Sequence, residues 1–194
     1  MKRIGIFGGT FNPIHTGHLF AAQMAQEILK LNKVIFVPSN LPPHKVGKNV
    51  IPSSFRYEMV RLAIEDNSSF EVSDFESKKN GKSYSIDTVR YLCNQLPRGT
   101  KIFFIIGRDG LATLHKWKQV NEILKLATFV AINRPGYGRI KERIKARTIG
   151  IPGLEISSSQ LRQRIAKGRT VKYLLPERVI QYIEKQGLYK GNRH

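Results

Sequence analysis

The chain has 194 residues, of which 41% are apolar and 24% are charged, a composition typical of one globular domain. No apolar stretch approaches the roughly 20 residues that a membrane-spanning helix requires. The single cysteine, Cys93, excludes an internal disulfide and a cysteine-based zinc site. We therefore expect a soluble cytoplasmic protein with one domain over residues 1–194.

The net charge of +19 and the isoelectric point near 10.3 are unusual. Such a positive field attracts polyanions: nucleic acid, an anionic membrane surface or phosphorylated small molecules. In the run Arg139–Arg147, basic residues alternate with Ile140 and Ile144. The pattern fits an exposed basic loop or a subunit contact equally well, so the sequence leaves a homo-oligomer open.

Short apolar runs that end near a glycine or a proline predict buried strands at residues 4–7, 34–37, 102–106 and 128–132. Apolar residues at helical spacing predict helices from about residue 17 and over 54–64, 83–96, 117–126, 157–167 and 176–186. In the first helix, the apolar face consists of Phe20, Met24, Ile28 and Leu31.

Strands that are apolar on both faces and alternate with helices favour an α/β fold. We expect a doubly wound, Rossmann-like parallel sheet, with the C-terminal helices (about 157–187) packed on the same domain. Ligands bind such sheets outside the carboxyl ends of the strands, so functional motifs should follow the strands directly.

The first such motif is Gly8-Gly9-Thr10-Phe11-Asn12-Pro13-Ile14-His15-Thr16-Gly17-His18, which runs from a strand end to a helix start. Glycines there let backbone amides approach an anion, and the helix start adds a partial positive charge. Two imidazoles, His15 and His18, could hold phosphoryl oxygens and stabilise developing charge. Helix capping and a metal pair are the alternatives, although the spacing of three and the lack of cysteines argue against a metal.

Two further motifs could bind anionic groups. Pro42-Pro43-His44-Lys45 places a rigid turn before two cations, although a solvated loop lysine explains it as well. Ser83–Thr88 opens a helix whose free amides suit a carboxylate, and ordinary capping is the alternative.

The last two motifs suit a nucleotide. Gly107-Arg108-Asp109 follows a strand, where the glycine admits a flat base and the carboxylate can accept ribose hydroxyls; a helix cap is the alternative. In the segment from Ile156 to Arg162, Ser158 and Arg162 lie four residues apart on one helix face. A hydroxyl, helix-start amides and a guanidinium then converge as a triphosphate requires, although a plain capped basic helix is also consistent.

In this order and spacing, the motifs resemble those of the His-x-Gly-His nucleotidyltransferase superfamily, and Pro13-Ile14-His15 resembles its bacterial nicotinate-nucleotide adenylyltransferases. The resemblance covers nearly the whole chain. It implies adenylyl transfer from ATP to nicotinate mononucleotide, which gives nicotinate adenine dinucleotide and pyrophosphate in NAD biosynthesis, with Mg²⁺ bound together with ATP. The chain departs from the family pattern at Asn12, where most members have Asp, and at Arg108, where Ala is more frequent. We expect a shape role of Asn12 to survive the exchange.

The resemblance also implies a role for individual residues. The catalytic positions, which face the phosphates, are His15, His18, Lys45 and Arg162. The ATP positions are Gly8, Gly9, Thr10, Phe11, Gly107, Asp109, Ser157 and Ser158. The positions for nicotinate mononucleotide are Tyr84, Ser85, Trp117 and Arg134. No protein ligand of a metal is implied.

Two other functions stay open at this point. The acceptor could be nicotinamide mononucleotide, phosphopantetheine or a cytidylyl acceptor, although Ser83–Thr88 and Trp117 argue for nicotinate. The charge of +19 could also mark a nucleic-acid-binding module. The sequence has no helix-turn-helix, zinc or RNA-binding signature, so we expect neither a specific nucleic acid nor a membrane as partner.

Overall fold

The computed structural model describes residues 1–41, 50–79, 81–133, 144, 146–152 and 154–191. The strands are β1 (Arg3–Gly9), β2 (Lys33–Pro38), β3 (Phe70–Val72), β4 (Lys101–Gly107), β5 (Thr128–Asn133) and β6 (Arg147–Gly150). The helices are α1 (Thr16–Leu29), α2 (Ser53–Ile64), α3 (Ser85–Gln95), α4 (Arg108–Thr113), α5 (Val120–Leu126), α6 (Ser158–Ala166) and α7 (Glu177–Lys185), with a 3₁₀ turn, η1, at Leu114–Lys116. None of these helices has the length and hydropathy of a membrane span.

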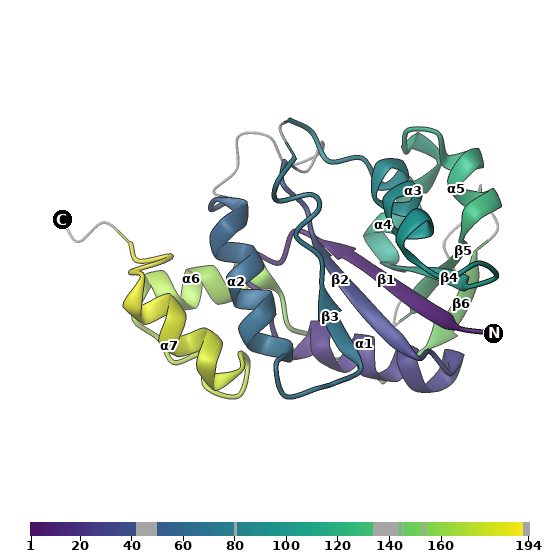
Figure 1. Ribbon diagram of the computed structural model, residues 1–194. Helices are drawn as coiled ribbons and strands as arrows, with labels where there is room; N and C mark the ends of the chain where they lie inside the picture. Colours follow the sequence, from purple (N-terminus) through teal and green to yellow (C-terminus); the bar gives the residue numbers. More distant parts are fainter. Residues whose placement is uncertain (42–49, 80, 134–143, 145, 153, 192–194) are drawn as a thin grey trace.

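All six strands form one parallel sheet in the order β3-β2-β1-β4-β5-β6. β1 lies at the centre, where Phe7 pairs with Phe36 of β2 on one side and with Ile105 of β4 on the other. The strand order reverses between β1 and β4, and this switch point is where doubly wound sheets bind ligands. The predicted α/β, Rossmann-like single domain is confirmed (Figure 1).

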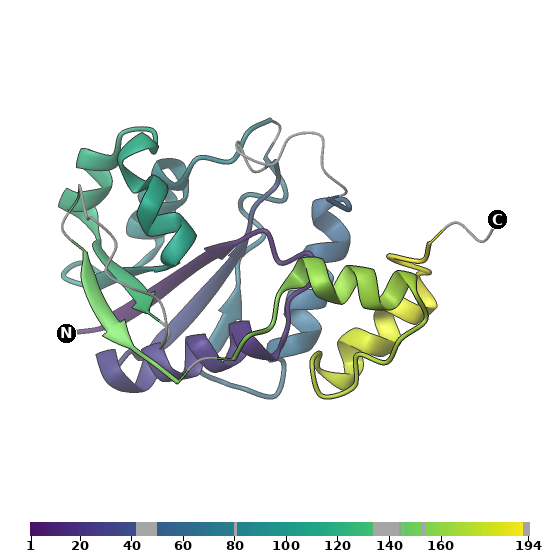
Figure 2. The ribbon, with the colours of Figure 1, turned by 180° about the vertical axis from the view of Figure 1, so that it is seen from behind.

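The sheet separates two apolar cores because successive side chains of a strand point to opposite faces. In β1, Ile4 and Ile6 belong to the core under α3 and α5, whereas Phe7 belongs to the core under α1 and α2. Helices α6 and α7 extend this second core beyond the sheet, with Leu161 and Val179 among its buried members. Figures 1 and 2 show α3, α4 and α5 gathered on one side of the sheet and α1 on the other.

Helix α1 buries a different face from the predicted one. Its buried residues are small, namely Gly17, Ala21, Ala22 and Ala25, with Leu29 at the end. Of the predicted face, Leu31 is buried beyond the helix end, Phe20 and Met24 pack at the margin, and Ile28 is 40% exposed. The large apolar residues predicted the wrong buried face. Alanines face the sheet instead, because their small side chains allow close contact between helix and sheet.

Several elements differ from the prediction. The sequence analysis missed β3, β6 and α4, which are three, four and six residues long. Helix α5 begins at Val120, three residues after its predicted start, because η1 precedes it and Trp117 has an extended backbone.

The packing at Gly5 of β1 is too close for a side chain, which predicts an effect on stability. A Cβ at Gly5 would lie 2.7 Å from Cδ1 of Leu31 and 3.0 Å from Cδ1 of Ile105. We expect Gly5→Val to lower the free energy of unfolding by about 2 kcal/mol, because overpacking forces neighbours to shift. Gly150→Val in β6 is the control, since no part of the described structure lies within 4 Å of a Cβ there. Urea unfolding compares the two, and equal stability would contradict the close packing.

Candidate active site

The first predicted motif forms the connection between β1 and α1. This connection is mostly buried, and Phe11 is only 2% exposed. A Cβ on Gly9 would lie 2.8 Å from Cζ of Phe11, so the glycine leaves room for the aromatic ring. Phe11 has φ of +47°, which turns the chain sharply after the strand. The loop therefore has a shape fixed by its own packing, and Phe11 contributes to it as a core residue.

The imidazole pair, His15 and His18, lies at the start of α1. The two rings stack with centroids 3.7 Å apart and planes inclined by 26°. The backbone N–H of His15 donates a 3.3 Å hydrogen bond to Nδ1 of His18, so neutral His18 carries its proton on Nε2. A Cβ on Gly17 would lie 3.2 Å from Nδ1 of His15, which explains the glycine between them.

The start of α6 lies against the connection that carries the imidazole pair (Figure 2). The hydroxyl of Ser158 donates to the carbonyl of Pro13 at 3.0 Å. Nη1 of Arg162 donates to the carbonyl of Asn12 at 2.8 Å, and Nη2 donates to Oγ of Ser159 at 3.2 Å. Motifs from opposite ends of the chain therefore share one site. Ser158 and Arg162 bind the backbone of the loop after β1, whereas the sequence predicted that they bind phosphate.

A buried arginine, missed in the sequence, joins three loops at this end of the sheet. Arg56 of α2 is 1% exposed. Its guanidinium donates to the carbonyls of Thr10 at 2.7 Å, Asn40 at 2.8 Å and Ile51 at 2.9 Å. Burial lowers the pKa of Arg56 to about 10. The three acceptors follow β1, follow β2 and precede α2, so one charge fixes the relative positions of these chain segments.

From Asn40 the polar contacts continue to the start of α3. The backbone N–H of Asn40 donates to Oγ of Ser83 at 2.8 Å. Ser83 and Thr88 both hydrogen-bond to the carboxyl group of Glu76, whose pKa is raised by burial. A continuous buried network thus links the loop after β1, through Arg56, to the predicted nicotinate position.

Two of the predicted mononucleotide residues, Tyr84 and Ser85, lie at the start of α3. Helix α3 begins at Ser85, and Tyr84 caps it with an extended backbone. Nζ of Lys118 lies 4.4 Å from the centroid of the Tyr84 ring. This contact brings the chain after η1, and with it a positive charge, to the helix start.

Trp117 directly precedes Lys118 in the chain and packs against a core. Its ring packs edge-on against Phe104 at 5.7 Å and Phe129 at 5.9 Å between centroids. The side chain is half-buried. Trp117 is therefore held firmly in place by the core under α3 and α5.

The predicted adenosine position lies at the end of β4. Gly107 is exposed and caps α4, and among the described residues nothing lies within 4 Å of a Cβ built on it. The backbone there is open to a flat group. Asp109 lies in the first turn of α4, and its side chain is outside the described part of the structure.

Some predicted residues fall outside the described residues. Lys45 belongs to 42–49 and Arg134 to 134–143. The basic run Arg139–Arg147 is described only at residues 144, 146 and 147, of which Arg147 begins β6.

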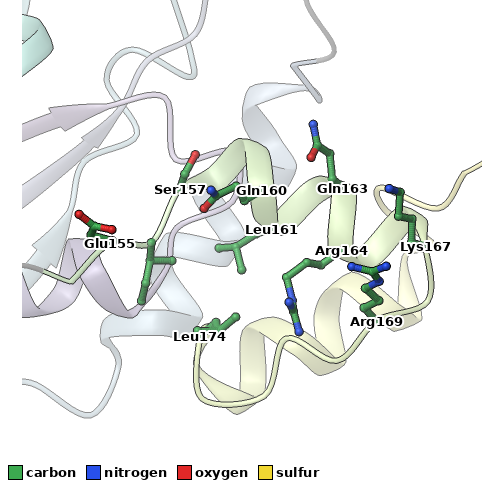
Figure 3. A pocket seen from close by; sticks show the side chains of 10 residues that line it. Glu155, Ser157, Gln160, Leu161, Gln163, Arg164, Lys167, Arg169 and Leu174 are labelled. Atoms are coloured by element: carbon green, nitrogen blue, oxygen red, sulfur yellow. The ribbon is translucent and has the colours of Figure 1, made fainter.

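A pocket of about 420 Å³ lies beside the site (Figure 3). It opens between α6 and the chain that follows it, and Figure 3 shows Arg164, Lys167 and Arg169 along its rim. Of the predicted site residues it includes Ser157 and neither member of the imidazole pair. Both Nε and Nη2 of Arg164 bind the carbonyl of Thr170, so this arginine stabilises the turn after α6.

Comparisons with known proteins identify the family of the chain. A family model described as cytidylyltransferase-like matches residues 6–164. A "Probable nicotinate-nucleotide adenylyltransferase" of Desulfitobacterium hafniense strain Y51 is 44% identical over 200 residues, covering 97% of this chain and 96% of that protein. A protein of the same name from Clostridium tetani is 41% identical and covers 98% and 100%.

Solved structures share the fold at low sequence identity. The Plasmodium falciparum nicotinic acid mononucleotide adenylyltransferase complexed with NaAD is similar over 100% of both chains, with a TM-score of 0.82 and 22% identity. A nicotinate-nucleotide adenylyltransferase structure from Vibrio parahaemolyticus has a TM-score of 0.71 and 21% identity over 98% and 96% of the chains. By its family match and its relatives, the chain belongs to the cytidylyltransferase-like family and, within it, to the nicotinate-nucleotide adenylyltransferases.

Proposed function

We propose that the chain transfers the adenylyl group of ATP to nicotinate mononucleotide, giving nicotinate adenine dinucleotide and pyrophosphate. The observation that carries the proposal is the contact between α6 and the loop that joins β1 to α1. Ser158 and Arg162 make this contact, at Pro13 and Asn12. Together with the stacking of His15 on His18, this contact supports one phosphate-binding site at the end of β1, next to the switch point of the sheet.

The reaction needs alignment and charge stabilisation more than it needs a protein base. A phosphate oxygen of the mononucleotide forms a bond to the α-phosphorus of ATP. The bond from that phosphorus to the bridging oxygen breaks, and pyrophosphate leaves with the oxygen. Because a phosphate monoester loses its second proton near pH 6, the nucleophile is already ionised at neutral pH. The enzyme contributes by holding both substrates in line and by offsetting negative charge.

The phosphate ligands come from three parts of the chain. His18, with Nε2 as the proton-bearing nitrogen, and His15 donate to phosphoryl oxygens as the bonds rearrange. The hydroxyl proton of Ser158 is already donated to the carbonyl of Pro13. Helix α6 would therefore bind the phosphates mainly through its first-turn amides and the charge of Arg162. Lys45, outside the described residues, is a proposed ligand on the resemblance alone.

The two nucleosides would lie on opposite sides of the phosphates. Adenosine would rest on the open backbone at Gly107, with Asp109 accepting the ribose hydroxyls, and Gly8, Gly9 and Thr10 would line the nucleotide. Nicotinate would lie between Trp117 and the amides at Ser85. The positive end of α3 and the nearby ammonium of Lys118 suit its carboxylate. A part for Arg134 stays a prediction.

Magnesium would enter with ATP. Within the described residues, no three side chains of His, Cys, Asp or Glu are grouped so as to hold a metal. Mg²⁺ commonly keeps water and substrate phosphates as ligands, and it would offset charge on the ATP phosphates.

Cytoplasmic location and a homo-oligomeric state also stay predictions.

The proposed function is tested directly by product analysis. We expect the purified protein, given ATP and Mg²⁺, to convert nicotinate mononucleotide to the dinucleotide with one pyrophosphate per product. The nicotinamide mononucleotide should react more slowly, because it has no carboxylate for the α3 start and Lys118. Chromatography of parallel reactions with both acceptors and with phosphopantetheine decides the matter. Preferred turnover of either rival acceptor would overturn the assignment.

His18 gives the second prediction. We expect His18→Ala to lower kcat by roughly 100- to 1,000-fold, because it removes a donor whose interaction is strongest in the transition state. The Kd for ATP should change little. Steady-state kinetics and direct ATP titration separate the two quantities, with Gln23→Ala on the same helix as control. Normal kcat with a large loss of ATP affinity would contradict the role.

Arg56 gives the third prediction. A lysine there cannot reach three carbonyls, so we expect Arg56→Lys to lower the free energy of unfolding by about 2 kcal/mol, since buried acceptors lose their donors. Arg61→Lys on the same helix is the control, because Arg61 is exposed and pairs with Glu58 and Glu65 at the surface, so the change should cost under about 1 kcal/mol. Urea unfolding compares them, and equal stability would remove the role of Arg56.

A further inference from the structure

After α7 the chain turns back toward the active site, and residues 187–191 are called the C-terminal tail. Gly187 ends the helix with φ of +62°, and the N–H of Leu188 donates to the carbonyl of Ile183 at 3.0 Å. Leu188 and Tyr189 then pack against the core that α1, α2, α6 and α7 share. Tyr189 itself has φ of +61°, so the chain turns twice within three residues. These turns direct the tail back toward the loop after β1.

The hydroxyl of Tyr189 reaches that loop and donates to Oδ1 of Asn12 at 2.8 Å. Asn12 is 4% exposed, so the contact is shielded from water. Burial raises the pKa of Tyr189, and the nearby charges of Arg162 and Arg56 oppose this only in part. The phenol therefore stays protonated near neutral pH and can donate this hydrogen bond.

Asn12 is thereby held at two points. Arg162 of α6 binds its backbone carbonyl, and Tyr189 of the tail binds its side chain. The next carbonyl, that of Pro13, is bound by Ser158. His15 lies only three residues from Asn12 and stacks on His18 at 3.7 Å, so a shift at Asn12 moves the ring pair. An asparagine side chain supplies the acceptor without placing a negative charge beside the phosphates.

From this geometry we infer that Tyr189 is a positioning residue, which sets the imidazole pair through Asn12 and makes the C-terminal tail part of the active site. The inference rests on the proposed adenylyl transfer, because the imidazole pair acts there on the phosphates. Tyr189 touches no reacting atom. Its effect must therefore appear in the rate of the chemical step more than in substrate affinity.

Tyr189→Phe tests the inference, because it removes one hydroxyl and keeps the packed ring. We expect kcat to fall about tenfold, since a small misplacement of catalytic groups is costly, while the KM values for ATP and the mononucleotide stay within about twofold. Tyr182→Phe is the matched control: Tyr182 lies in α7 and packs on Phe55 of α2, with ring centroids 6.5 Å apart. The control should keep wild-type kcat.

A double-mutant cycle with Asn12→Ala separates positioning from general support of the fold. If Tyr189 acts through Asn12, Tyr189→Phe lowers kcat in the wild-type background and causes no further loss in Asn12→Ala. A full tenfold loss in both backgrounds, or an unchanged kcat in Tyr189→Phe alone, would overturn the inference. A wild-type protein that fails to join ATP and nicotinate mononucleotide would instead refute the proposed function, so the two failures are distinguishable.

Discussion

A charged group buried where three loops meet constrains the whole active end of the molecule. Removing a guanidinium from water is costly unless its nitrogens find acceptors in good geometry. Arg56 meets this condition with backbone carbonyls of Thr10, Asn40 and Ile51. The loops after β1 and β2 and the start of α2 must therefore converge on this side chain. The backbone at the proposed substrate site is thus held by a charge that need not itself touch substrate.

The distribution of buried polarity supports the same conclusion. In the part of the chain that the structure describes, the buried polar side chains are Asn12, His15, Arg56, Glu76, Ser83 and Thr88. They all belong to the loop after β1 or to the network that joins this loop to α3, while the middle of the sheet is apolar on both faces. Buried polar groups need partners, so they cluster where loops with unpaired backbone groups meet. That place is the carboxyl edge of the sheet, which is also where ligands bind.

Much of the fold could be predicted because the central strands are continuous apolar runs and the motifs follow them directly. Strands β3 and β6 could not, since three or four residues at a sheet edge carry too little pattern. The face of α1 was wrong because alanine is a weak signal of burial, although it allows the closest packing. The motif from Gly8 to His18 and the pair Ser158 and Arg162 were predicted and do meet.

The supporting residues were harder to predict because they act through distant parts of the chain. Arg56 aligns with Met59, Val60 and Ala63 at buried helical spacing, and this pattern was the available signal, yet an arginine at such a position is usually read as surface. The sequence around Tyr189 carries no such signal, because its hydrogen-bond partner Asn12 is 177 residues away. Both residues stabilise the backbone of one loop, Arg56 at the carbonyl of Thr10 and Tyr189 at the side chain of Asn12. Precise placement of a catalytic group requires support from several rigid elements, and here α2, α6 and the C-terminal tail supply it.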